Sequence, residues 1–250
     1  MKDIKEYANK PFVFKTMQGK VTNFNSSDDF ISGISSAPEM RFSNKSSLLA
    51  ALDALHSDRN NTQKQTELFR QIEQTTLLSR AEKVTWLKPR IDRLPAPFAM
   101  LLATLVAPDN LDEAFQWKVL SQLRMKIDAR KCQDNSVAQG IKLIEYYYLD
   151  NLFELMTKHY VKKQPASKLN NTYLNAEFNR RNFSAIPAVL QYHKTHPYKI
   201  EQPYWLANHG MNHILALMQG NINHKGQLVS KKRAKEGEAE LLKIFSASAK

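Results

Sequence analysis

Aromatic and basic side chains alternate through residues 146–205, which hold half of the chain's 24 Phe, Tyr and Trp residues. Cations bind phosphates, aromatic rings stack on bases and amides read base edges. The segment therefore predicts a nucleic-acid-binding surface. Its candidate cations are Lys158, Lys162, Lys163, Lys168, Arg180, Arg181, Lys194 and Lys199. The alternative is that helices bury most of these rings, although the run Tyr146, Tyr147 and Tyr148 cannot be buried whole because successive helical side chains point about 100° apart.

A second basic run lies near the end of the chain. It consists of Lys231, Lys232, Arg233 and Lys235. Three glutamates and then four large apolar residues follow between residues 236 and 245. This order predicts a mobile basic loop that leads into a short amphipathic helix over 236–246. The loop is expected to touch phosphate, or the helix to dock on a partner.

Histidines cluster between residues 193 and 224, and His209 and His213 share a helical face at a spacing that can hold a metal ion. The zincin pattern requires Glu directly after the first His, and this chain has Gly210 there. His224 is a further weak candidate ligand. We expect these imidazoles to bond to neighbouring protein groups, and we predict no metal and no cofactor.

Other catalytic patterns are missing from the sequence. Neither a G-x-x-x-x-G-K-[ST] nor a G-x-G-x-x-G loop occurs, and Cys132 is the one cysteine and lies in no nucleophile motif. The longest apolar run, residues 98–107, is too short to cross a bilayer, and the N-terminus lacks an apolar signal core. We therefore expect a cytoplasmic protein that is not an enzyme and has no membrane partner.

Charge is distributed unevenly along the chain. The formal net charge is +12 at pH 7, and +11 of it lies after residue 115. A neutral front half and a basic back half favour a surface that meets a polyanion. Two alternatives stay open, namely solvated lysines with no partner and an acidic protein partner.

The elements that must position these residues are helices. Only 7 of 250 residues are Gly, which argues against sheet folds rich in tight turns. We predict an all-α, multi-helix bundle over 46–220, preceded by an irregular arm over 1–45 and followed by a basic tail over 221–250. Residues 11–24 of the arm have the pattern of a short β-hairpin.

Helix signals recur along the bundle. Ser47 is expected to cap a helix that runs through His56, and Thr62–Gln65 and Ser79–Glu82 read as capping boxes. Residues 97–106 are apolar on all sides, which predicts a central helix. Further helices are expected over 110–130, 137–162, 170–181, 184–194 and 203–219. The pair 171–181 and 184–194 is a candidate helix-turn-helix, with an ordinary helical hairpin as its alternative.

These patterns together favour a non-enzymatic accessory or regulatory protein that binds nucleic acid, DNA or RNA, through its back half within a larger assembly. The alternative is an adaptor or assembly subunit that docks on proteins through its N-terminal arm and C-terminal helix. A metal-dependent hydrolase built on the histidines is a distant third possibility.

Overall fold

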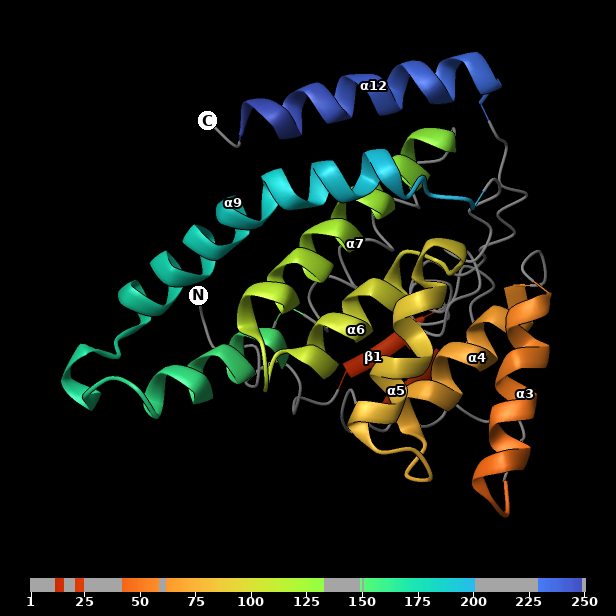
Figure 1. Cartoon of the computed structure of the whole chain (residues 1–250), viewed down its shortest axis with the longest axis horizontal. Helices are drawn as coiled ribbons and strands as arrows, with labels where there is room; N and C mark the ends of the chain where they lie inside the picture. Colours follow the sequence, from red (N-terminus) through yellow and green to blue (C-terminus); the bar gives the residue numbers. More distant parts are fainter. Residues whose placement is uncertain are drawn as a thin grey trace.

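The computed structural model describes residues 12–15, 21–24, 42–58, 62–132, 149, 151–200 and 229–248. This part of the chain is an all-α, multi-helix body with one short strand pair, as the sequence predicts (Figure 1). Its elements are β1 (Phe12–Lys15), β2 (Val21–Phe24), α3 (Lys45–Ser57), α4 (Thr62–Gln74), α5 (Arg80–Leu87), the 3₁₀ helix η1 (Lys88–Arg93), α6 (Pro97–Val106), α7 (Leu111–Lys131), a helix over residues 151–161, η2 (Ala166–Lys168), α9 (Asn171–Thr195) and α12 (Lys231–Ala247).

The core is built around α6 and α7, which pack against each other in the middle of the body. Because α6 has almost no polar residue, burial on nearly every side is its favourable environment. The predicted core positions Phe98, Met100, Leu101, Leu102 and Val106 are buried, while Leu105 is partly exposed. α7 buries the predicted stripe of Phe115, Val119, Leu123 and Ile127. The central-helix prediction is confirmed.

The helices α3, α4 and α5 test the three capping predictions. The N-cap of α3 is Asn44 and not Ser47, whose backbone N–H donates to the Asn44 side chain at 2.9 Å. The box at Thr62 is also wrong, because Thr62 is already helical and the Gln65 amide donates to the Leu55 carbonyl, 3.1 Å away, closing the end of α3. The box at Ser79 and Glu82 is confirmed, with both of its reciprocal bonds present.

The predicted break between residues 181 and 184 does not exist. α9 runs without interruption from Asn171 to Thr195, and Pro187 lies inside it. Proline removes one backbone donor, yet α9 continues through it because Ala185, Ile186 and Val189 pack on the body. The helix-turn-helix interpretation is therefore wrong. Tyr192 and His193, within the second helix of the predicted pair, bond to Asp92 and Glu238 of the protein.

The C-terminal helix is longer than predicted. α12 begins at Lys231, so the basic run forms its first turns and is not a mobile loop. The helix lies along α7 and α9 at the top of Figure 1, where it runs antiparallel to α9. Leu241 of α12 is buried against the body. A Cβ atom added at Gly237 would lie 3.0 Å from the Arg130 Cδ. Glycine at this position lets α12 approach α7 closely.

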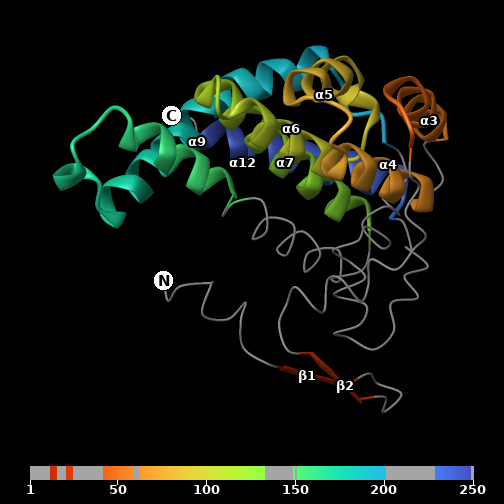
Figure 2. The same cartoon turned by 90° about the horizontal axis from the view of Figure 1, so that it is seen from below.

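The strand pair confirms the predicted hairpin. β1 and β2 are antiparallel, with Phe12 opposite Phe24 and Lys15 opposite Val21. Figure 2 shows the two strands apart from the helices. The predicted helix over 203–219, the part of 137–162 before residue 149, and the candidate ligands His209, His213 and His224 lie outside the described residues. No helix within the described ranges combines the length and apolar character needed to span a membrane.

Candidate functional site

The candidate cations divide into three settings along α9. Arg180 and Arg181 lie near its middle, Lys194 and Lys199 lie at its C-terminal end, and Lys158, Lys162, Lys163 and Lys168 lie before its N-terminal end. An α-helix rises 1.5 Å per residue, so the 25 residues of α9 hold its two ends about 37 Å apart. Sequence spacing gave no reason to separate these groups.

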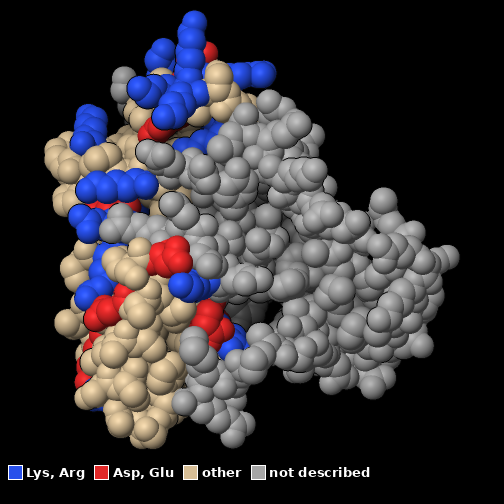
Figure 3. All heavy atoms as spheres, turned by 90° about the vertical axis from the view of Figure 1, so that its right-hand side faces the viewer, with Lys and Arg blue, Asp and Glu red and all other residues tan. Residues whose placement is uncertain are grey.

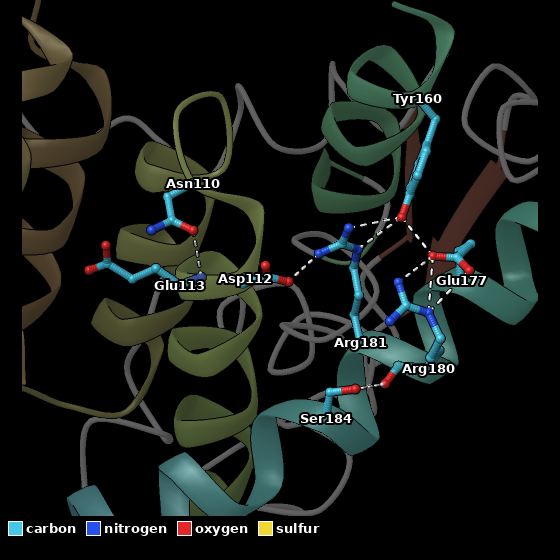
Figure 4. Close-up of polar contacts among 8 residues, drawn as sticks. All are labelled: Asn110, Asp112, Glu113, Tyr160, Glu177, Arg180, Arg181 and Ser184. Carbon is cyan, nitrogen blue, oxygen red and sulfur yellow. Dashed lines mark hydrogen bonds and ion pairs between the residues drawn. The ribbon is translucent and has the colours of Figure 1, made fainter. Parts of the chain in front are cut away.

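The two arginines bond to groups of the protein itself (Figure 4). The Arg181 guanidinium donates to the Tyr160 hydroxyl oxygen, 2.9 Å from its Nη2, and to Asp112 at the start of α7. Tyr160 in turn donates to the Glu177 carboxylate at 2.6 Å. Arg180 pairs with the same carboxylate at 2.7 Å. This chain of contacts fastens helix 151–161 and α7 to α9, which gives both arginines a structural role.

The acidic member of this network is strongly perturbed. Hydrogen bonds from Arg180 and then from Tyr160 lower the pKa of Glu177 to about 2, because each stabilises its ionised form. Burial raises the pKa of the Tyr160 hydroxyl, and the bond to Glu177 raises it further. Glu177 is the only carboxylate in the α9 sequence, and its charge is matched by these neighbours.

A second polar network between α7 and α9 is still more buried. Arg124 is fully buried, and its Nη1 donates to the Ile91 carbonyl at 2.9 Å while its Nη2 pairs with Asp92 at 2.6 Å. The Tyr198 hydroxyl donates to the Asp128 carboxylate at 2.8 Å. Burial and the adjacent Asp128 raise the pKa of Tyr198 well above its usual value. Inside the body, Arg124 is thus paired with Asp92, and Asp128 accepts a hydrogen bond from Tyr198.

The loop before α9 presents exposed lysines. Lys162, Lys163 and Lys168 are exposed there, and we call these three residues the basic tip. Lys158 pairs with Glu154 one helical turn away at 2.7 Å, and both side chains are well exposed. Such a surface pair is screened by water and leaves Lys158 able to contact a ligand.

The opposite end of α9 meets the ends of two other helices. The Val229 N–H donates to the Lys131 carbonyl at 2.9 Å, which joins the start of α12 to the end of α7. His193 of α9 contacts Glu238 of α12 at 3.0 Å, and Lys131 Nζ donates to the Ile200 carbonyl at 2.6 Å. Three chain segments that are distant in sequence therefore converge here.

We call the cations at this convergence the basic end of the molecule. They are Arg130, Lys131, Lys194, Lys199, Lys231, Lys232, Arg233 and Lys235. Figure 3 shows Lys and Arg side chains gathered at the top of the molecule, over the beginning of α12. Lys231, Lys232, Arg233 and Lys235 are all exposed. The three glutamates of α12 lie beside them and offset part of this charge.

Helix dipoles account for some of these cations but not for others. Arg130 and Lys131 occupy the last turn of α7, and Lys194 occupies the last turn of α9, where positive charge is favourable. The first turn of α12 holds Lys231, Lys232 and Arg233 and no acidic residue. Cations at this positive pole repel the helix dipole. An external anion placed there would relieve that repulsion.

A shallow cleft of about 660 Å³ lies beside the basic end, between the end of α7 and one face of α12. It is lined by Arg130, Cys132, Val229, Arg233, Glu236, Gly237 and Glu240. Arginines and glutamates alternate on its wall, so its charge is mixed. The concentrated positive charge is at its rim, where α12 begins.

Arg130 and Lys131 were absent from the predicted binding residues. Their signal was in the sequence, as basic residues in the last turn of a helix, but the dipole already explained them. Only the packing of α12 on α7 places them beside Lys231 and its neighbours. The aromatic residues of 146–205 also differ from one another in the structure. Tyr160 and Tyr192 are bonded within the body, whereas Phe183 is 56% exposed.

The described histidines do not converge. His193 bonds to Glu238, and this bond lowers the pKa of the Glu238 carboxyl. His196 stacks on Tyr192, with ring centroids 4.2 Å apart. Within the described residues, no group of three or more His, Cys, Asp or Glu side chains is arranged to hold a metal ion.

Comparisons with family models, with curated proteins and with solved structures found no match to this chain.

Proposed function

We propose that this protein binds nucleic acid through the basic end, as a non-enzymatic accessory or regulatory protein within a larger assembly. The observation that carries the proposal is the convergence of cations on one end of the body, where the exposed lysines and arginine of α12 lie beside the exposed Lys194 and Lys199 and the partly buried end of α7. Clustered lysines and arginines release counterions when they neutralise phosphates, which makes such a cluster a strong electrostatic site.

The first turn of α12 supports the same proposal. Lys231, Lys232 and Arg233 lie at its positive pole, where they destabilise the helix in isolation. Their side chains are exposed, and the Lys232 ammonium lies a long 4.0 Å from the Glu236 carboxylate. A polyanion would supply the opposite charge that the protein leaves unmatched.

The test measures binding of a fluorescein-labelled 20-base-pair DNA duplex, the corresponding RNA duplex and each single strand by fluorescence anisotropy. The full-length chain should bind at about 50 mM salt and lose affinity steeply as salt rises, because exposed charges are increasingly screened. The variant Lys231→Ala, Lys232→Ala, Arg233→Ala, Lys235→Ala should bind more weakly. If all four contact a B-form duplex, the slope of log affinity against log salt should flatten by about 3 to 4.

A matched control removes four exposed cations from the helices that precede α6 in the sequence. Its substitutions are Lys45→Ala, Lys64→Ala, Arg80→Ala and Lys88→Ala. This variant loses the same net charge, so its affinity should stay close to that of the wild type if position and not total charge decides binding. Absence of binding to every nucleic acid at about 50 mM salt, or equal loss in both variants, would overturn the proposal.

A second candidate function is protein docking through α12, and one observation favours it. Beneath α12 the buried atoms Arg130 Nε and His193 Nδ1 find no hydrogen-bond partner among the described residues. Unpaired buried polar groups weaken the contact between α12 and the rest of the body. Ile244 on the same helix is 51% exposed. A protein that co-purifies after nuclease treatment, and is lost when residues 229–250 are deleted, would favour this adaptor role.

A further inference from the structure

The exposed side of α9 forms one continuous stripe between the two basic groups. Exposed residues recur every three or four positions along its whole length, so they share one helical face. They are Thr172, Asn175, Ala176, Asn179, Arg180, Phe183, Ser184, Pro187, Ala188, Gln191, Lys194 and Thr195. We call this set the α9 stripe.

The chemistry of the α9 stripe is uncharged or positive throughout. It contains no carboxylate, since the single acidic residue of α9, Glu177, is partly buried and bonded to Tyr160 and Arg180. The stripe presents amides at Asn175, Asn179 and Gln191. Phe183 lies near its centre and is 56% exposed, which is costly for a ring that has no contact to make.

Both ends of the stripe lead into exposed cations. The basic tip precedes its first residue, and Lys194 and the rest of the basic end adjoin its last. As a regular helix the 25 residues of α9 are about 37 Å long, which gives the scale of the separation between the two groups. One turn of B-form DNA, after which phosphates return to the same face of the duplex, is about 34–36 Å.

We infer that the α9 stripe lies along double-stranded DNA, with the basic tip and the basic end holding phosphates about one helical turn apart. This inference rests on the proposed function and adds to it the class of nucleic acid and the length of the site. A continuous helix joins the two cation groups, and a regular duplex repeats its phosphates at a distance of similar size. A helix that lies along a duplex in this way rests on the backbone, where the amides and the phenyl ring between the two groups suit phosphate and sugar contacts. An A-form RNA duplex arranges its backbone differently, around a deep, narrow major groove and a wide, shallow minor groove.

The experiment compares labelled DNA duplexes of 6, 12 and 18 base pairs with single strands of equal length, using the full-length chain at constant salt. A 6-base-pair duplex reaches one cation group, whereas a 12-base-pair duplex reaches both. Affinity should therefore rise by about 10²-fold between 6 and 12 base pairs, as expected when a second site binds intramolecularly, and then level off. Single strands should show no such step.

Two variants test which residues produce the rise in affinity between 6 and 12 base pairs. Lys162→Ala, Lys163→Ala, Lys168→Ala should abolish the gain at 12 base pairs while leaving 6-base-pair binding unchanged. Phe183→Ala together with Asn179→Ala should weaken binding to the 12-base-pair duplex at every salt concentration without changing the salt slope, because neither side chain is charged. The matched control Lys45→Ala, Lys64→Ala, Lys88→Ala should leave the step intact.

The outcomes separate this inference from the proposed function. If no nucleic acid binds, the proposed function itself fails. If duplexes bind without a step, or if the basic-tip variant keeps the step, the basic end acts alone and the inference is overturned. Preference for single strands or for RNA duplexes also overturns it. Equal competition by poly-L-glutamate would assign the surface to an acidic protein instead.

Discussion

The cations between α7 and α9 differ from those of the basic end in what surrounds their charge. Arg124 is fully buried against Asp92, and Arg181 is held by Asp112 and Tyr160. Lys231 and Arg233 are exposed at the positive pole of a helix. All four are basic residues in the back half of the chain. A basic residue therefore indicates a ligand only where the protein does not already balance its charge.

The sharpest test of this comparison removes the most buried cation. Arg124→Met should lower the free energy of unfolding by about 3–5 kcal/mol, because it leaves Asp92 bonded to the Tyr192 hydroxyl but without its cation, and the Ile91 carbonyl without its donor. Urea denaturation at pH 7 measures this change. The exposed Arg93→Met, on the adjacent η1, should change stability by less than about 0.5 kcal/mol. Similar losses of unfolding free energy in both variants would show that burial of a cation does not decide how much it stabilises the fold.

A smaller loss is expected at Arg181, whose side chain is 13% exposed and whose partner Asp112 is 82% exposed. Solvent screens this pair, so Arg181→Met should cost about 1–3 kcal/mol in unfolding experiments. Arg180→Met, at a side chain that is 58% exposed, should cost about 0–1 kcal/mol. DNA affinity of the folded Arg181→Met protein should equal that of the wild type. A specific loss of affinity would place Arg181 in the binding surface after all.

Acid should loosen the same network. The pKa of Glu177 is lowered to about 2 in the folded protein from an ordinary value of 4.5, so its ionised form stabilises the fold above pH 4.5. That contribution should be lost as the pH falls from about 4.5 towards 2. Unfolding free energies measured across this range should decline less steeply in Glu177→Gln than in the wild type. Identical slopes would show that the bonds from Arg180 and Tyr160 add no stability.

The smallest effect on stability is expected at the basic end, and it has the opposite sign. Lys231→Ala removes one cation from the positive pole of α12 and should stabilise the protein by about 0.3–1 kcal/mol at low salt. Thermal unfolding at two salt concentrations measures this, and the gain should shrink at high salt. A clear destabilisation would mean that this side chain holds the structure, as Arg124 does.

The sequence by itself determined the class of fold and much of the core. Residues 97–106 form a central helix because no face of that segment is polar, and Ser79 with Glu82 caps α5 through bonds within four residues. Local signals of this kind need no knowledge of distant neighbours. The hairpin over 12–24 follows from the same kind of short-range pattern.

Local signals misled the sequence analysis where packing outweighed them. The expected turn near Asn182 is overridden in α9, which also continues through Pro187, because Ala185, Ile186 and Val189 gain burial only if the helix continues. Gln65 matched a capping box, but its amide serves the end of α3 across the interhelical contact. In both regions the deciding partners lie outside the local window.

The candidate site depended on tertiary structure to a greater degree. The sequence supplied the cations and their enrichment after residue 115, but it could not tell Arg181, bonded to Asp112 and Tyr160, from Lys194, which faces solvent. It also could not bring the start of α12 to the end of α7, since the contact of Val229 with Lys131 joins residues about a hundred positions apart. Composition fixes how much charge a chain carries, whereas only packing decides which charges are neutralised inside and which meet the solvent together.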